Sequence, residues 1–138
     1  MIVIDTNVVS EIVKLTPAPA VLHWFELQKA GSLYTTTVTL AEILFGIELL
    51  PRGRRRDTLR DAASMILEQK FAGRILPFDE SSAYAFAIIA SEHRKGGRTI
   101  DDLDSQIAAI ALSRSAALAT RNVKDFRDCG LQLINPWG

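Results

Sequence analysis

Four acidic residues stand in or beside apolar segments of the chain, where a charged side chain needs a specific reason to occur. Asp5 directly follows a short aliphatic run, and Glu42 lies on a largely apolar helical stripe. Asp104 heads the apolar stripe of a later segment, and Asp125 follows another apolar run after a short turn. A buried carboxylate must be paired or must bind a cation. Four such residues, spread along the chain, therefore indicate a site for divalent metal ions.

Each of these acids also has an ordinary structural interpretation. Asp5 could cap the helix that follows it, and Glu42 could form a buried ion pair with an arginine. Asp104 could interact with a helix dipole, and Asp125 could form an Asx turn or a second helix cap. Considered jointly, the four favour metal binding. Carboxylates gathered within about 4 Å of one another repel by roughly 4 kcal/mol per pair at an effective dielectric constant near 20. A hard cation such as Mg²⁺ or Mn²⁺ removes that cost and prefers oxygen ligands.

Polar residues beside the acids can support such a site. Thr6 and Thr120 can hold a carboxylate or an attacking water, and Asn7 stands two positions after Asp5. Asn122 is nearer to the end of its apolar run than Asp125 and could reach the same centre through its amide oxygen. Whether Asn122 or Asp125 completes the site is left open by the sequence, as is the choice between one metal and two.

Strands and helices are expected to alternate along the chain, which indicates an α/β fold with a mostly parallel sheet. Strands are predicted at 2–4, 33–35, 75–76, 117–120 and 131–134. Helices are predicted at 8–14, 21–29, 38–50, 52–71, 80–94 and 101–115. In such sheets ligands bind at the carboxyl ends of the strands. Asp5 and the turn after Thr120 would share that edge, and Glu42 and Asp104 would lie early in helices that start there.

Length and composition narrow the class of protein. The 138 residues, 48% of them hydrophobic, are expected to form a single domain over 1–138. No apolar run approaches the length of a membrane span, and no signal peptide is apparent, so we expect a cytoplasmic protein without membrane contact. The single cysteine excludes a disulfide framework, and two histidines disfavour a histidine metal centre or a Ser-His-Asp triad.

Basic residues balance the acidic ones in number but not in position. The chain has 16 of each, and 11 of the basic residues lie in three stretches, 52–60, 94–98 and 121–127. If a metal neutralises the four acids, the surface around them becomes basic and suited to nucleic acid. The candidates for contact with a nucleic acid are Arg55, Arg56, Arg121 and Lys124.

Six segments, in their order along the chain, resemble the PIN-domain ribonucleases, in particular the VapC/FitB-like toxins of type II toxin–antitoxin pairs. They are Ile4-Asp5-Thr6-Asn7, the segment 39–46 around Glu42, the arginine-rich start of the following helix, the segment 104–111, the segment 118–126, and Asn135-Pro136-Trp137. Each is weakly specific by itself, but they occur in order from Ile4 to Trp137, so the resemblance extends over essentially the whole length of the chain.

The resemblance implies a PIN-like three-layer sandwich, with a central, mostly parallel sheet flanked by helices. It implies an Mg²⁺-dependent endoribonuclease (Mn²⁺ being possible) that hydrolyses RNA phosphodiesters with a metal-activated water, with Asp5, Glu42 and Asp104 as metal ligands. It also implies inhibition by a cognate VapB/FitA-like antitoxin, and a homodimer. We expect the apolar side chains of Leu33, Tyr34, Leu49 and Leu50 to be exposed on the surface of one copy, where a second copy could bind. Asn122 stands where some family members carry an aspartate, so the catalytic set is completed either by Asp125 or by this neutral ligand.

Three other classes fit less well. A haloacid-dehalogenase-type phosphatase needs a second aspartate two residues after the first, where this chain has Asn7. A response-regulator receiver domain needs paired acids after its first strand and a lysine after its last. A PIN-fold nucleic-acid-binding module with a degenerate, non-catalytic metal site is the remaining alternative, and retention of all three core acids argues against it.

Overall fold

The central sheet has five strands, all parallel, in the order β3-β2-β1-β4-β5. The computed structural model describes all 138 residues. Its strands are β1 (Ile2–Ile4), β2 (Leu33–Thr36), β3 (Ile75–Leu76), β4 (Ala117–Ala119) and β5 (Leu133–Ile134). Ile4 pairs with Ala119, so the chain leaves β1 and β4 side by side at the same edge. The residues that follow these two strands are therefore neighbours in space.

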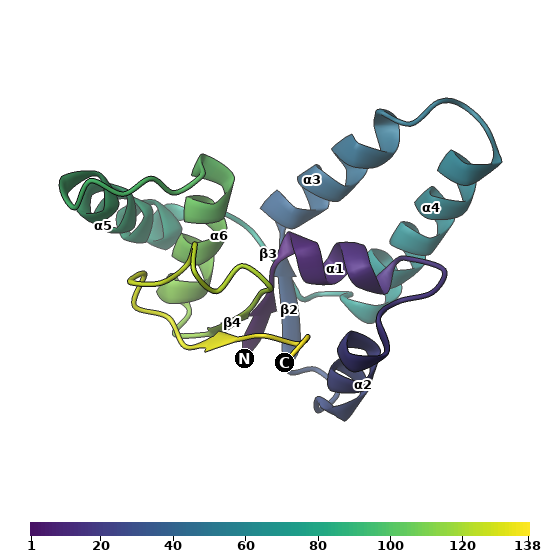
Figure 1. The fold of residues 1–138 in the computed structure, drawn as a ribbon, viewed down its shortest axis with the longest axis horizontal. Coiled ribbons are helices and arrows are strands. Elements are labelled where there is room, and N and C mark those ends of the chain that lie inside the picture. The colour runs from purple at the N-terminus through teal and green to yellow at the C-terminus, as the bar shows by residue number, and fades with distance from the viewer.

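Helices cover both faces of this sheet and produce three layers (Figure 1). They are α1 (Thr6–Ile12), α2 (Pro19–Leu27), α3 (Thr37–Glu48), α4 (Arg54–Ser64), α5 (Glu80–Lys95) and α6 (Asp102–Ser113). On β1, Val3 belongs to the apolar cluster that holds α5 and α6, whereas Ile4 belongs to the cluster that holds α1, α2 and α4. Successive strand residues point to opposite faces, which explains this division. Both side chains are fully buried.

Helices α3 and α6 stand on either side of the point where β1 ends. In Figure 1 the molecule has two arms, one formed by α5 and α6 and the other by α3 and α4, and α1 lies below α3. Helix α3 contributes to both apolar clusters, through Val38 to one and through Ile43 and Ile47 to the other. Its first turn is thereby anchored over the carboxyl edge of the sheet.

The predicted fold class is confirmed, and each predicted strand and helix is present within a few residues. One difference concerns 52–71, predicted as a single helix. There α4 gives way to the π-helix η1 (Met65–Lys70). The buried apolar stripe continues from Ala63 in α4 to Leu67 in η1, so the hydrophobic pattern does not reveal the wider turn of the π-helix.

The expectation that the Leu33 side chain is exposed is wrong, since Leu33 lies in β2 and is only 7% exposed. None of the helices is both long and apolar enough to span a membrane.

Candidate active site at the carboxyl edge of the sheet

Asp5 is both a helix cap and a member of the site, because its two carboxylate oxygens have different partners. Oδ1 accepts a 2.8 Å hydrogen bond from the backbone N–H of Thr6, which starts α1. Oδ2 accepts a 2.8 Å hydrogen bond from the hydroxyl of Thr120. The side chain is 3% exposed. Burial raises the pKa of Asp5 above its ordinary value, and the two hydrogen bonds oppose that rise.

Thr120 joins the two loops that follow β1 and β4. Its fully buried hydroxyl donates to Asp5 and accepts from the backbone N–H of Asn122 at 3.0 Å and from Asn7 Nδ2 at 3.4 Å. The side-chain oxygen of Asn7 in turn accepts a 3.3 Å hydrogen bond from the backbone N–H of Arg121. The predicted supporting residues are thus connected, and they fix the position of the Asp5 carboxylate.

Glu42 reaches the site from the second turn of α3. The hydroxyl of Thr6 donates a 2.8 Å hydrogen bond to Glu42 Oε1 and lies 2.9 Å from the hydroxyl of Thr39. Thr6 therefore contacts both Asp5 and Glu42, one through its backbone and the other through its side chain. Glu42 is half-buried and forms no ion pair with any basic side chain, so the alternative of an arginine partner is wrong.

Asp104 lies in the first turn of α6, but the cap of that helix is Asp101, whose carboxylate accepts from the backbone N–H of Leu103. Capping therefore does not require Asp104. Burial is the main cause that raises the pKa of Asp104 to about 7, and the charges of Asp5, Asp101, Glu42 and Asp125 raise it further. A bound cation would relieve this repulsion.

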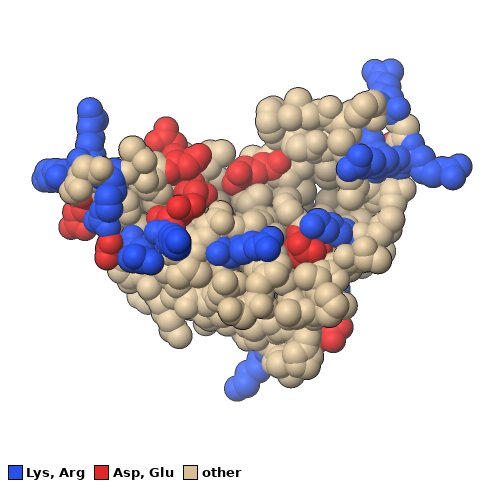
Figure 2. All heavy atoms as spheres, in the orientation of Figure 1, with Lys and Arg blue, Asp and Glu red and all other residues tan.

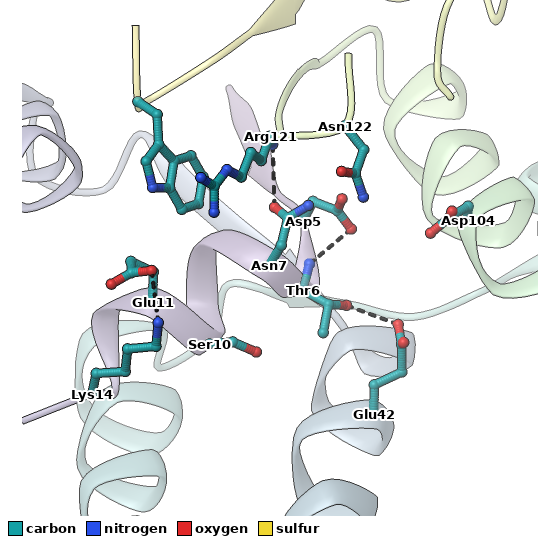
Figure 3. A pocket seen from close by; sticks show the side chains of 11 residues that line it. Asp5, Thr6, Asn7, Ser10, Glu11, Lys14, Glu42, Asp104, Arg121 and Asn122 are labelled. Atoms are coloured by element: carbon teal, nitrogen blue, oxygen red, sulfur yellow. Dashed lines mark hydrogen bonds and ion pairs between the residues drawn. The ribbon is translucent and has the colours of Figure 1, made fainter. Parts of the chain in front are cut away.

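These three acids line one cavity of about 410 Å³ at the carboxyl edge of the sheet (Figure 3). Asn122 also lines it, and Figure 3 shows its amide just above the Asp5 carboxylate, with Asp104 farther to the right. Asp125 is exposed and does not line the cavity, although its charge contributes to the raised pKa of Asp104. Of the two candidates for completing the site, the geometry therefore favours Asn122. The full lining is Asp5, Thr6, Asn7, Ser10, Glu11, Lys14, Glu42, Asp104, Arg121, Asn122 and Trp137.

The donor chemistry of this cavity suits a hard divalent cation, because the acids and Asn122 offer oxygen ligands and neither histidine nor cysteine is present. As the side chains stand, no three His, Cys, Asp or Glu residues are close enough together to form a ready-made metal site. Mg²⁺ commonly keeps several waters and uses only one or two protein carboxylates. The residues therefore fit a cation that is held partly through water.

The predicted RNA-contacting residues differ in their surroundings. Arg121 lines the acidic cavity, and Arg55 lines an adjoining hollow that also contains Glu42. Arg56 instead pairs with Glu48 at 2.5 Å across α3 and α4, and Lys124 is exposed and lines neither hollow. Figure 2 shows acidic atoms on the walls of the hollow between the two arms, with basic side chains below it and at the outer ends.

Four lining residues were not predicted: Ser10, Glu11, Lys14 and Trp137. Glu11 is only 8% exposed and accepts hydrogen bonds of 3.0 Å from the backbone N–H of Ala18 and from Lys14. From the sequence alone, Glu11 is indistinguishable from an ordinary polar residue of a short helix. The apolar neighbours Val8, Val9 and Ile12 were the one available sign that this segment is buried.

Comparison with known proteins gives a consistent result over the whole chain. The PIN domain family profile matches residues 2–130. The chain is 38% identical to "VapC ribonuclease Y4jK" of Sinorhizobium fredii, covering 99% of this chain and 98% of that protein. It is 36% identical to "Toxin FitB" of Neisseria gonorrhoeae, covering 99% of both. A solved structure of FitAB bound to an IR36 DNA fragment superposes with a TM-score of 0.92 at 36% identity, covering all of this chain and 96% of that one.

Proposed function

Because the chain belongs to the PIN domain family, we propose that it is a metal-dependent endoribonuclease and the toxin of a VapBC-type toxin–antitoxin pair. The observation that carries this proposal is the group of Asp5, Glu42 and Asp104 around one cavity, without a basic side chain paired to any of them. Similarity to a protein named as a VapC ribonuclease and to one named as a toxin supports it.

Asp5, Glu42 and Asp104 would hold Mg²⁺ or Mn²⁺, directly or through water, and Asn122 would offer a neutral oxygen beside them. A bound cation of this kind stabilises charge on a phosphodiester and lowers the pKa of a coordinated water. Oxygen ligands without nitrogen or sulfur match the preference of both ions.

The protein's own residues orient the reacting groups. Thr120 and the backbone of Thr6 each use one oxygen of Asp5, which leaves a lone pair on both oxygens and fixes the plane of the carboxylate. The Thr6 hydroxyl orients Glu42 in the same way. In the metal-free protein the pKa of Asp104 is about 7, so its carboxyl group can hold or release a proton at neutral pH. Arg121 places positive charge at the wall of the cavity, where a phosphate would enter.

A cognate antitoxin and a two-fold homodimer complete the proposal. The likeness to a solved FitAB structure supports an antitoxin of the FitA type. The dimer is supported by apolar side chains that α3 and the residue after it leave in solvent: Leu44, Phe45 and Leu49 are 45%, 66% and 69% exposed. Closed two-fold dimers are the commonest homo-oligomers, and apolar patches of this kind are typical of interfaces.

Expression of the chain in bacteria tests the biological part of the proposal. We expect induction of the wild type to arrest growth and coexpression of a cognate antitoxin to restore it, while Asp104→Asn leaves growth unaffected at equal protein level. Arg56→Ala is a suitable control, because its partner Glu48 lies away from the cavity and the variant should remain toxic. Growth arrest by Asp104→Asn equal to that of the wild type would remove the nuclease site from the explanation.

A nucleic-acid-binding module with a degenerate site is the second candidate. It is favoured by one observation, namely that the three carboxylates do not form a closed metal cluster as they stand. That candidate predicts RNA binding without cleavage under any divalent ion, which separates it from the nuclease.

A further inference from the structure

Trp137, which follows strand β5, forms part of the cavity wall. Its ring packs against the apolar cluster that contains Ile4, Val8 and Val9, and it also lines the acidic cavity. Its backbone N–H donates a 3.0 Å hydrogen bond to the side-chain oxygen of Asn135. The indole is therefore held in place and presents a surface to the site.

Arg121 lies over that surface. Its guanidinium carbon is 4.9 Å from the centre of the Trp137 ring, within the range of a cation–π contact. At its other end the backbone N–H is bound by Asn7, two residues after Asp5. Figure 3 shows the guanidinium in front of the indole, on the opposite side of Asp5 from Asp104.

Arg121 is also the one cation of this cavity without a carboxylate partner. The other cation, Lys14, pairs with Glu11 at 3.0 Å. No acidic oxygen lies within ion-pair distance of the Arg121 guanidinium, although the cavity contains four acidic residues. A guanidinium that stacks on an aromatic ring keeps its N–H donors free at its edge, and these match the geometry of a phosphate.

We propose that Trp137 is a positioning residue that holds the Arg121 guanidinium at the cavity wall, where it binds a phosphate oxygen of the RNA strand beside the acidic residues. The inference rests on the proposed function for the identity of the ligand. It assigns a role in substrate binding to the C-terminal segment, and it makes the contribution of Trp137 dependent on Arg121.

A double-mutant cycle on RNA affinity tests this dependence. All proteins carry Asp104→Asn, so that binding is measured without cleavage, and the ligand is a fluorescein-labelled single-stranded RNA oligonucleotide followed by anisotropy. We expect Trp137→Leu to raise Kd by about 3- to 10-fold, the range of a partly exposed cation–π contact. Trp137→Phe retains an aromatic face and should restore most of the affinity. Arg121→Ala should weaken binding at least as much and reduce the salt slope by about one.

In the Arg121→Ala protein, Trp137→Leu should have no further effect on Kd. Additive effects of the two substitutions, or an unchanged Kd in Trp137→Leu, would overturn the inference and leave the nuclease proposal intact. Trp24→Leu is the matched control, because Trp24 packs in the same apolar cluster but does not line the cavity. Equal weakening by both tryptophan substitutions would indicate a loss of folding only. Absence of cleavage by the protein with native Asp104, together with the expected cycle, would instead overturn the nuclease proposal alone.

Discussion

Thr120 Oγ1 donates a 2.8 Å hydrogen bond to Asp5 Oδ2, joining the ends of two neighbouring strands that are 115 residues apart in the chain. This contact connects the fold to the site, because the parallel pairing of β1 and β4 places both residues at one edge. The carboxylate is buried, so its orientation depends on this donor and on the backbone of Thr6.

Replacement of Thr120 by valine should therefore destabilise the protein. Thr120→Val removes the donor to Asp5 and the acceptor for Asn122 without a change of side-chain shape. We expect the free energy of unfolding to fall by about 1–3 kcal/mol, the usual cost of leaving a buried polar group without its partner. Thr120→Ser keeps the hydroxyl and should lose much less. Urea unfolding of the three proteins measures this, and equal midpoints for valine and threonine would contradict it.

Asp104 should make the stability of the metal-free protein depend on pH. Its pKa is about 7 in the folded state and near 3.8 when unperturbed, so the folded state binds a proton that the unfolded state has released. Stability then falls as pH rises from about 4 to 7 and stays lowered above that. Asp104→Asn, which cannot ionise, should be more stable than the wild type at pH 8 in EDTA, with the difference vanishing near pH 4. Thermal midpoints that run in parallel across this pH range would exclude the effect.

Mn²⁺ should raise the thermal midpoint of the wild type, since a ligand that binds only the folded state stabilises it. At a concentration 100 times the Kd this amounts to about 2.7 kcal/mol. Asp5→Asn and Asp104→Asn should lose most of the shift. Asp125→Asn should keep it, because Asp125 is exposed and does not line the cavity. A shift that survives in Asp104→Asn but disappears in Asp125→Asn would reverse the assignment of the site.

Arg55 and Arg56 should behave differently although they are adjacent. Arg56 pairs with Glu48, whereas Arg55 forms no ion pair and lines a hollow beside Glu42. We expect Arg55→Ala to weaken RNA binding and to reduce the salt slope by about one. Arg56→Ala should leave that slope unchanged and lower stability by about 1 kcal/mol or less, as for other exposed ion pairs. Equal salt slopes in the two variants would show that Arg55 is not at the RNA path.

The fold and the acidic core were predictable because their signals are local or depend on topology alone. Asp5 and Glu42 are charges in apolar surroundings, and the parallel order of strands brings the ends of β1 and β4 together. The placement of Asp125 could not be predicted in the same way. It lies only three residues after Asn122, and the path of the turn between them decides which side chain faces the cavity.

Residues that join the site through tertiary contacts were beyond the reach of sequence patterns. Trp137 was recognised as part of a closing motif, but nothing in the motif indicates that the ring lies under Arg121. Glu11 is buried because the chain returns to it at Ala18, and that return depends on the path of the loop between α1 and α2. The π-helix η1 continues the apolar stripe of α4, so the spacing of hydrophobic residues does not distinguish its wider turns from those of an α-helix.

Cleavage of single-stranded RNA by the purified, antitoxin-free protein tests the central claim most directly. The wild type should cleave in the presence of Mg²⁺ or Mn²⁺ and stop when EDTA is added. Asp5→Asn and Asp104→Asn should lose at least about 100-fold in rate, as expected when a residue that holds a catalytic metal ion is changed, and Asn122→Ala should lose less. Wild-type rates in Asp104→Asn, or cleavage that continues in EDTA, would contradict the assignment of these acids as the site of a metal-dependent ribonuclease.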